Sequence, residues 1–483
     1  MSGSGKWIAA LVAAVLVAGA GGMYAGASLD QGGYDAPLSQ GDSNSDGEGS
    51  GWDKVHRAFD VISEGYVEEV NEDELYEGAI RGMLEELEDP YSVYMDRDTA
   101  EQFTQSLGNE FEGIGAEVNM VNGNVTIVSP IQGSPAEEAG LMPDDRILEV
   151  DGNPTEGQTL NEALMQIRGE KGTNVVLTIG RASASEPFEV EIERDSIPVE
   201  TVHAHHYERD GQDIGVLEIT SFSIDTADEF REGLDELENG GIDGLIVDVR
   251  ANPGGYLNSV QEIGSLLLPK GETIVQVEEP DGTVTETPST LEENKSYPIV
   301  GLINGGSASA SEILAAALNE AGGYELVGET TFGKGTVQQS YDFGDGSEMN
   351  LSMFRWLTSA GNDIHEEGVE PTIEQTQPDY FYATALAIDE PLEPNDNNDQ
   401  VRSAQEILLG LGYEPGRTDG YFDEQTENAV IAFQEMADDL DVNGTINEET
   451  AQALHTSIVE QIREPSNDRQ LNRAIEVILE QAS

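Results

Sequence analysis

The spacing of apolar side chains divides the chain into segments with different expected secondary structure. From Trp52 to Leu107 apolar residues recur at helical intervals, and Asp89-Pro90 is expected to end the second helix of a hairpin. Short apolar runs separated by glycine-rich turns predict strands and two short helices between residues 111 and 198. Residues 199–378 alternate apolar strands with helical patterns, which is typical of an α/β fold. We therefore expect a multidomain protein that combines α/β and α+β parts.

The two ends of the chain have patterns of their own. Lys6 precedes an apolar stretch that reaches Ala27, which predicts a signal peptide or a membrane anchor over residues 1–27, and either reading exports the rest of the chain. Residues 28–51 are rich in Gly, Ser and Asp and predict a flexible acidic linker, and residues 379–400 predict a second linker. Residues 401–462 predict a small all-α module, which is followed in residues 463–483 by an amphipathic C-terminal helix.

The charge balance narrows the possible partners. The chain has 483 residues with 95 Asp and Glu against 22 Lys and Arg, a formal net charge of -73. No basic stripe is present to bind phosphates, so nucleic acid is excluded as a partner. Such a charge favours a protein adapted to concentrated salt, where a Debye length of about 3 Å at 1 M screens the repulsion. The alternative is an ordinary acidic secreted protein. The absence of cysteine excludes disulfides, thiolate catalysis and thiolate metal sites.

Candidate chemistry gathers around one turn between a strand and a helix. The apolar strand Pro298 to Ile303 runs into a turn of small residues, and Glu312 follows Ser309 by three positions, which is a capping-box arrangement at a helix start. Such a turn presents a serine hydroxyl and free backbone N–H groups at the positive end of a helix. Further along, Lys334 stands among glycines and apolar residues. A serine at a helix start and a lysine in apolar surroundings are the components of a Ser–Lys nucleophilic site.

Residues 111–198 resemble a PDZ domain in the circularly permuted form found in bacterial proteases. The resemblance lies in the segment Phe111-Glu112-Gly113-Ile114-Gly115-Ala116, the capped helix that starts after Ser134, and the strand Arg146 to Val150. It implies that Gly113, Ile114, Gly115 and Ala116 form a loop that holds the carboxylate of a bound peptide C-terminus. The bland alternative is a glycine turn between strands. Arg168, at the end of the second predicted helix, is a candidate link to the α/β part, residues 199–378.

Residues 401–462 resemble the peptidoglycan-binding module of cell-wall proteins. The matching residues include Leu411-Gly412-Tyr413, Asp419 to Asp423 and Phe433-Gln434. The resemblance implies retention at a cell wall with peptidoglycan as a partner, although such a module can also have a purely structural role.

Three motifs in order resemble those of the C-terminal-processing peptidases, also called tail-specific proteases, which are serine peptidases of the Ser–Lys type. They are Asn252-Pro253-Gly254-Gly255, Ser307 to Glu312, and Phe332 to Gln338. The resemblance implies that Ser309 is the nucleophile, a choice that the residues alone do not make among three nearby serines. It implies that Lys334 is the general base, which requires a pKa below the usual value of about 10.4.

The same resemblance assigns supporting roles around the Ser–Lys pair. Gln338 would orient the lysine amine by a hydrogen bond. The backbone N–H of Ala310, together with that of Gly254 or Gly255, would form the oxyanion hole, and the sequence leaves open which glycine takes part. The chain departs from the family pattern at Phe354 to Gly361 and at Glu370-Pro371-Thr372, which bears on substrate preference. No cofactor or metal is expected.

Several alternatives use other residues. A classical Ser–His–Asp site or a metal site would need His203, His205, His206 or His365, and no H-E-x-x-H helix pattern is present. The preferred hypothesis is an exported, wall-associated serine endopeptidase that recognises or is gated by C-terminal tails of protein or peptide substrates. The other hypotheses are a non-catalytic adaptor built of PDZ and wall-binding domains, and a cell-wall hydrolase. The N-terminal helical hairpin is a candidate surface for a homodimer.

Overall fold

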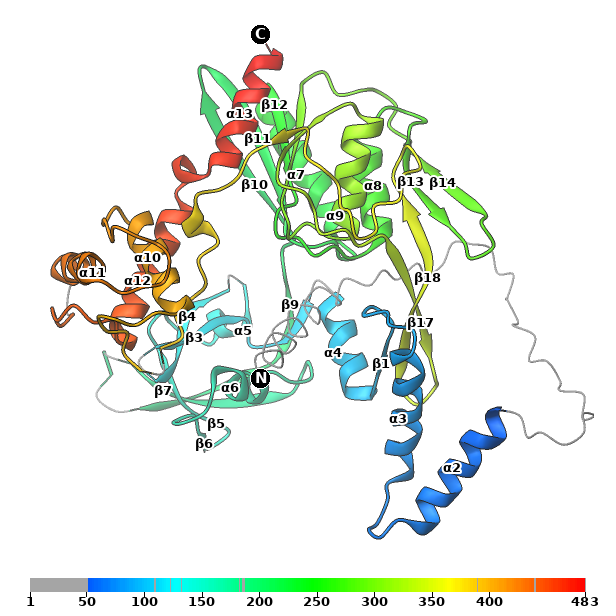
Figure 1. The fold of residues 1–483 in the computed structure, drawn as a ribbon, viewed down its shortest axis with the longest axis horizontal. Coiled ribbons are helices and arrows are strands. Elements are labelled where there is room, and N and C mark those ends of the chain that lie inside the picture. The colour runs from blue at the N-terminus through cyan, green and yellow to red at the C-terminus, as the bar shows by residue number, and fades with distance from the viewer. Residues whose placement is uncertain are drawn as a thin grey trace, which may run out of the picture.

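The computed structural model describes residues 51–482 apart from 108–109, 122, 132, 182, 185–186, 389 and 438–439. The predicted signal or anchor segment and most of the first predicted linker lie outside the described residues. Within the described part, no helix is long and apolar enough to cross a membrane. Figure 1 shows three lobes, a large α/β lobe, a smaller β-rich lobe and a helical lobe, with a helical arm at the N-terminal side.

The N-terminal region is helical, as the apolar spacing predicts. It contains α2 (Gly51–Gly65), α3 (Glu72–Glu85), the short strand β1 (Val93–Met95) and α4 (Arg97–Leu107). Helix α2 buries none of its residues and extends away from the other elements, with Phe59 stacked on Tyr76 of α3 at 4.5 Å between ring centroids. Strand β1 pairs antiparallel with β18 (Glu348–Leu357), so the N-terminal region is joined to the α/β lobe by a sheet.

The β-rich lobe has the predicted order of strands and two short helices. Its main sheet follows the order β3-β4-β5-β7-β8, with β6 on β5, and a separate two-stranded sheet pairs β2 with β9. The strands are β2 (Glu110–Gly113), β3 (Ala116–Val121), β4 (Asn124–Pro130), β5 (Arg146–Val150), β6 (Asn153–Pro154), β7 (Asn174–Gly180), β8 (Phe188–Glu193) and β9 (Asp195–Pro198). Helices α5 (Pro135–Glu138) and α6 (Leu160–Ile167) start at the side-chain caps Ser134 and Thr159.

The α/β lobe is built on a six-stranded sheet in the order β10-β11-β12-β15-β16-β19. All neighbours are parallel except the edge pair β10 and β11. The strands are β10 (Val202–Arg209), β11 (Gln212–Ile219), β12 (Gly244–Asp248), β15 (Ile299–Ile303), β16 (Glu325–Gly328) and β19 (Ile373–Glu374). The two central strands β12 and β15 are buried at every position, as expected for a parallel sheet covered on both faces.

Different helices cover the two faces of this sheet. One face packs on α7 (Thr226–Gly240), α8 (Leu257–Leu267) and α9 (Ala310–Ala316), which continues as a π turn over Ala317–Ala321. The other face packs on the C-terminal helix α13 (Arg469–Ala482), with the buried Ile478 lying over Gly244 of β12 (Figure 1). A side chain at position 244 would meet Ile478 at 2.3 Å, so glycine is what allows this close approach. The predicted amphipathic C-terminal helix therefore completes the core of the α/β lobe.

A second sheet extends from the α/β lobe toward the N-terminal region. It runs in the order β1-β18-β13-β14, and β17 also pairs with β18. The remaining strands are β13 (Thr273–Glu278), β14 (Val284–Pro288) and β17 (Thr336–Asp342). Strand β17 carries Gln338 and directly follows Lys334, so this sheet positions one side of the candidate site.

The C-terminal module is inserted between β19 and α13 and contains α10 (Asp399–Gly410), α11 (Glu424–Met436) and α12 (Glu448–Arg463), with short 3-10 turns at Asp379–Phe381 and Pro465–Asn467. Its helices begin at Asn398, Asp423 and Asn447, whose side chains accept backbone N–H groups. The segment 379–400, expected to be a linker, packs differently. Leu392 is buried in the core of the module and pairs with Ile446, and the N–H groups of Asn395 and Asn398 donate to the carbonyls of Phe422 and Gly420.

Candidate active site

The turn after β15 holds Ser309 in an unusual backbone conformation. Ser309 has φ 55° and ψ -111°, a region that L-residues rarely occupy and that costs about 1–3 kcal/mol. Its N–H donates to the Glu312 carboxylate at 2.7 Å, and the Ala308 N–H donates to the Asn252 carbonyl at 3.0 Å. The surrounding hydrogen bonds therefore maintain a strained turn that places Ser309 at the start of α9.

The three neighbouring serines differ in their hydrogen bonds. The Ser307 hydroxyl donates to the Val249 carbonyl at 2.8 Å, and the Ser311 hydroxyl donates to the Asn252 carbonyl at 2.9 Å. The Ser309 Oγ is buried and has no hydrogen-bond partner among the described residues. Of the three hydroxyls, only that of Ser309 is not used in a hydrogen bond within the described part of the chain, so it is the one available to act as a nucleophile. The structure thus separates Ser309 from its neighbours where the sequence pattern does not.

The carboxylate of Glu312 connects the serine turn to the lysine loop. One oxygen accepts the N–H groups of Ser309 at 2.7 Å and Lys334 at 2.8 Å. The other accepts the N–H of Gly333 and the hydroxyl of Thr331, each at 2.6 Å. Burial raises the pKa of Glu312, and these four hydrogen bonds oppose that effect. A single side chain on α9 thereby fixes the backbone of both candidate catalytic residues.

Lys334 is buried in a pocket that disfavours its charge. Its side chain is 1% exposed, and its Nζ has no hydrogen-bond partner among the described residues. Burial lowers the pKa of Lys334 to about 8, against the opposing charges of Asp89 and Glu312. The Nζ lies 4.7 Å from the centre of the Tyr91 ring, a cation–π arrangement. An amine with this pKa is partly neutral near neutral pH and is able to accept a proton.

Gln338 lies close to this region but is bonded elsewhere. Its side-chain nitrogen donates to the hydroxyls of Thr336 and Ser352, each at 3.0 Å. The expected hydrogen bond from Gln338 to the Lys334 amine is absent, because the Lys334 Nζ has no partner in the described part of the chain. That prediction does not hold in this arrangement of the site.

The Asn252 to Gly255 loop lies against the serine turn. A Cβ on Gly254 would stand 2.9 Å from the Ser309 Cβ and 3.0 Å from the Ala310 nitrogen, so only glycine fits there. The Gly254 N–H donates to the Asn252 side chain at 2.8 Å. Gly255 packs against the carbonyl of Phe222, which a Cβ would meet at 1.9 Å. The structure therefore brings Gly254 to the serine turn beside Ala310, with the Gly254 N–H already donated to Asn252, whereas the nearest neighbours of a Cβ on Gly255 belong to Phe222.

The predicted peptide loop, Gly113 to Ala116, lies at the start of the β-rich lobe. Gly115 has φ 73°, and its carbonyl accepts the Ser134 hydroxyl at 2.7 Å. The Ile114 carbonyl accepts the Ala136 N–H of α5 at 2.8 Å. The loop is thus held against the N-terminus of α5 rather than left as a free turn.

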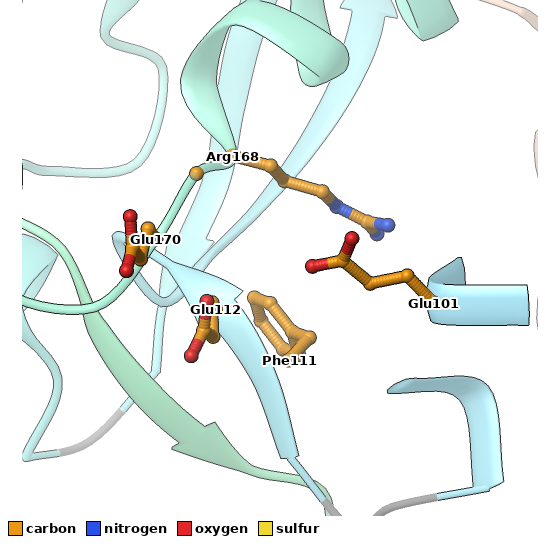
Figure 2. Close-up of a pocket in the computed structure, with 6 residues that line it drawn as sticks. Glu101, Phe111, Glu112, Arg168 and Glu170 are labelled. Atoms are coloured by element: carbon orange, nitrogen blue, oxygen red, sulfur yellow. The ribbon is translucent and has the colours of Figure 1, made fainter. Parts of the chain in front are cut away.

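Arg168 lines a cavity between the β-rich lobe and the N-terminal region. The cavity has a volume of about 430 Å³ and is lined by Glu101, Phe111, Glu112, Arg168, Gly169 and Glu170. The Arg168 guanidinium lies over the Phe111 ring at 5.6 Å and turns toward Glu101 of α4 (Figure 2). The residue opposite Arg168 in this cavity is Glu101 of α4, in the N-terminal region, whereas the sequence interpretation links this arginine to the α/β part of the chain.

The histidines serve other contacts. His205 and His206 of β10 face Glu218 and Asp213 across the exposed β10–β11 pair. The Nδ1 of His365 accepts the Gly335 N–H at 3.3 Å. No group of three or more metal-ligating side chains is present among residues that the structure describes. The unpartnered Ser309 hydroxyl contacts none of these histidines, which argues against a Ser–His arrangement.

Two contacts of the lysine come from residues to which the sequence pattern assigns no site role. Tyr91 and Asp89 belong to the turn that the pattern identifies only as a helix stop, and no local signal connects them to Lys334. Their approach results from the pairing of β1 with β18, which is a contact between distant parts of the sequence.

Comparisons with known proteins show the family to which the chain belongs. The sequence profile of peptidase family S41 matches residues 213–375, a PDZ domain profile matches 126–181, and a putative peptidoglycan binding domain profile matches 397–454. The profile of the activating protease CtpB N-terminal domain matches residues 16–99. The resemblances to the C-terminal-processing peptidases, to a PDZ domain and to a peptidoglycan-binding module are thus confirmed.

Individual relatives extend over nearly the whole chain. Carboxy-terminal processing protease CtpB of Bacillus subtilis (strain 168) is 45% identical over 477 residues, which cover 97% of this chain and 98% of that protein. Carboxy-terminal processing protease CtpA of the same organism is 39% identical over 429 residues, or 89% and 90% of the two chains. The solved photosystem II D1 C-terminal processing protease aligns with 25% identity and a TM-score of 0.41, covering 68% of this chain and 94% of that one.

The chain belongs to the carboxy-terminal processing proteases of peptidase family S41, which are serine-type peptidases that carry a PDZ domain. The predicted fold class and the predicted enzyme class are both confirmed. The peptidoglycan-binding domain and these relatives agree with a location outside the cytoplasm, at or near the cell wall.

Replacing the connecting carboxylate tests its structural role. In Glu312→Gln an amide nitrogen replaces one of the two acceptor oxygens. In one orientation the N–H groups of Ser309 and Lys334 lose their acceptor, and in the other the N–H of Gly333 loses it, and each buried unsatisfied donor costs about 1–3 kcal/mol. We expect the free energy of unfolding to fall by about 2–4 kcal/mol in denaturant titrations. The matched control is Glu162→Gln, which alters the exposed capping-box carboxylate of α6. Equal losses in the two variants would contradict the role given to Glu312.

Proposed function

We propose that the chain cleaves exported proteins as a serine endopeptidase, with Ser309 as nucleophile and Lys334 as general base. The observation that supports this most directly is the pair of buried side-chain atoms Ser309 Oγ and Lys334 Nζ, which have no hydrogen-bond partner among the described residues. The backbone N–H groups of the same two residues donate to one carboxylate, that of Glu312. A neutral lysine amine takes the proton from the serine hydroxyl while the oxygen attacks the scissile carbonyl carbon. The resulting ammonium returns this proton to the leaving amine, and an acyl-enzyme remains.

Hydrolysis of the acyl-enzyme repeats the same proton transfers. Lys334 accepts a proton from water as the water oxygen attacks the ester carbonyl, and returns it to the Ser309 oxygen as the ester bond breaks. The Ala310 N–H, next to the nucleophile, is our first candidate donor to the oxyanion in both steps, and such a donor is worth about 3 kcal/mol. For the second donor we favour Gly255, because the Gly254 N–H already donates to Asn252.

The separate contacts of Lys334 and Gln338 suggest a site that is not assembled for reaction. The amine lies over Tyr91, and Gln338 donates to Thr336 and Ser352 instead of orienting the amine. In the assembled state that we propose, the Lys334 amine accepts the Ser309 hydroxyl instead of lying over the Tyr91 ring. We propose that binding of a substrate C-terminus at the loop Gly113 to Ala116, with Arg168 facing the N-terminal helices, favours this assembled state.

The proposed nucleophile is tested by a serine series in the full chain. Ser309→Ala and Lys334→Met are expected to abolish cleavage of an unfolded casein, because each removes a reacting group while keeping similar packing. The matched controls are Ser307→Ala and Ser311→Ala, which remove structural hydroxyls and should retain cleavage at a reduced stability. Residual activity of Ser309→Ala at the level of the controls would refute the assignment.

Assays of casein cleavage and of murein release also distinguish the two other candidate functions. A non-catalytic adaptor predicts that casein is not cleaved by the unmodified chain. A cell-wall hydrolase predicts release of murein fragments without proteolysis. Retention on peptidoglycan is proposed for residues 401–462, and co-sedimentation of the Ser309→Ala chain with purified peptidoglycan tests it independently of catalysis.

Three further proposals concern the export of the chain, its adaptation to salt and its oligomeric state. We propose that residues 1–27 carry the chain to or through the membrane and that the charge of -73 adapts it to concentrated salt. Helix α2 buries none of its residues, and Trp52, Val55 and Ile62 are exposed on it, which favours a homodimer through this arm. Sedimentation equilibrium tests the homodimer. Activity measured against sodium chloride concentration tests the salt adaptation, and we expect a maximum at high concentration. A monomer, or a maximum at low salt, would refute the respective proposal.

A further inference from the structure

The turn between α3 and β1 lies directly on the candidate general base, although it belongs to the N-terminal region. Tyr91 in this turn is half-buried, and its ring centre lies 4.7 Å from the Lys334 Nζ. Two carboxylates favour the ammonium form of Lys334 by their charge, and Asp89 in the same turn has a larger effect than Glu312. Tyr91 and Asp89 lie outside residues 213–375, which match the peptidase family profile.

Hydrogen bonds fix this turn in place. The Asp89 carboxylate accepts the Tyr91 N–H at 3.0 Å and the Ser92 hydroxyl at 2.5 Å. The Ser92 oxygen accepts the Ser352 N–H of β18 at 3.1 Å. The Ser352 hydroxyl in turn accepts the Gln338 side chain at 3.0 Å. The turn, β18 and Gln338 are therefore one connected polar network beside the lysine.

The chemistry of the contact depends on the charge of the amine. An ammonium is attracted to the face of an aromatic ring and to a nearby carboxylate, whereas a neutral amine gains little from either. The Lys334 Nζ makes no hydrogen bond in the described part of the structure, so the ring and the surrounding carboxylates are its compensation for burial. Burial also raises the pKa of Tyr91, so the ring remains neutral at the pH where the lysine titrates.

We infer that Tyr91 and Asp89 are positioning residues for Lys334, which hold its protonated amine over the Tyr91 ring and unbonded to Ser309. This inference rests on the proposed Ser–Lys function. Loss of the proton releases the amine from the ring, and the neutral amine is then free to accept the Ser309 hydroxyl. The N-terminal region thus sets the pH range in which the peptidase site assembles.

Other titratable groups near the amine enter the test as controls. Glu312 of α9 is the second carboxylate that acts on Lys334, and Glu366 acts on Tyr91. His365 accepts the N–H of Gly335, the residue next to the lysine, at 3.3 Å. If His365→Gln keeps the wild-type pH profile of kcat/KM, the increase of kcat/KM with pH does not arise from this histidine.

The experiment compares the pH dependence of kcat/KM on an unfolded casein for Tyr91→Phe, Tyr91→Leu and Asp89→Asn in the full chain. Tyr91→Phe keeps the ring face and should keep the wild-type profile. Tyr91→Leu and Asp89→Asn no longer favour the ammonium form, so the lysine loses its proton more readily. Their rising limb is expected to move to lower pH by about half a unit to one unit.

The possible outcomes separate this inference from the proposed function. Profiles of Tyr91→Leu and Asp89→Asn that match wild type or move to higher pH would overturn it, as would an equal shift in Tyr91→Phe. If Tyr91→Leu fails to fold, the isosteric Asp89→Asn decides alone. Activity that survives in Ser309→Ala would instead defeat the proposed function, whatever the pH profiles show.

Discussion

The site depends on one buried carboxylate that serves two segments at once. Glu312 caps the turn that holds Ser309 in a strained conformation, and it also accepts the N–H groups of Gly333 and Lys334. Without an acceptor in this position, buried backbone donors on both segments would be unsatisfied. The relative position of the serine turn and the lysine loop is therefore set by Glu312, whose side chain takes no proton in the proposed reaction. Its position three residues after the serine follows from the geometry of a helix start.

The parts around this carboxylate come from distant stretches of the chain. The sheet of the α/β lobe supplies the serine turn after β15, and the loop from Asn252 to Gly255 follows its neighbour β12. The lysine loop follows β16 and leads into the second sheet, to which β1 of the N-terminal region is added. The α13 helix closes the opposite face, with the helical C-terminal module inserted before it. The same lobe thus holds the candidate reacting groups and joins the N-terminal region, the PDZ domain and the C-terminal module.

Features of the site that are set by neighbouring residues could be predicted from the sequence, whereas features that depend on contacts between distant residues could not. The strand, the small-residue turn and the capping glutamate at position 312 are local patterns, and the structure forms them as expected. The choice of Ser309 required knowledge of which hydroxyls bond to Val249 and Asn252, and those carbonyls lie some 60 positions earlier in the chain. The packing of Tyr91 on Lys334 has no local signal, because it arises from the pairing of β1 with β18.

Covalent labelling tests the central claim most directly, because it reports the reactive hydroxyl without requiring the natural substrate. The full chain is treated with a fluorophosphonate, digested, and analysed by mass spectrometry to locate the modified serine. We expect a single label on Ser309, rising with pH as Lys334 loses its proton near its pKa of about 8, and its loss in Lys334→Met. A label on Ser307 or Ser311, or equal labelling of Ser309 in Lys334→Met, would contradict the Ser–Lys site.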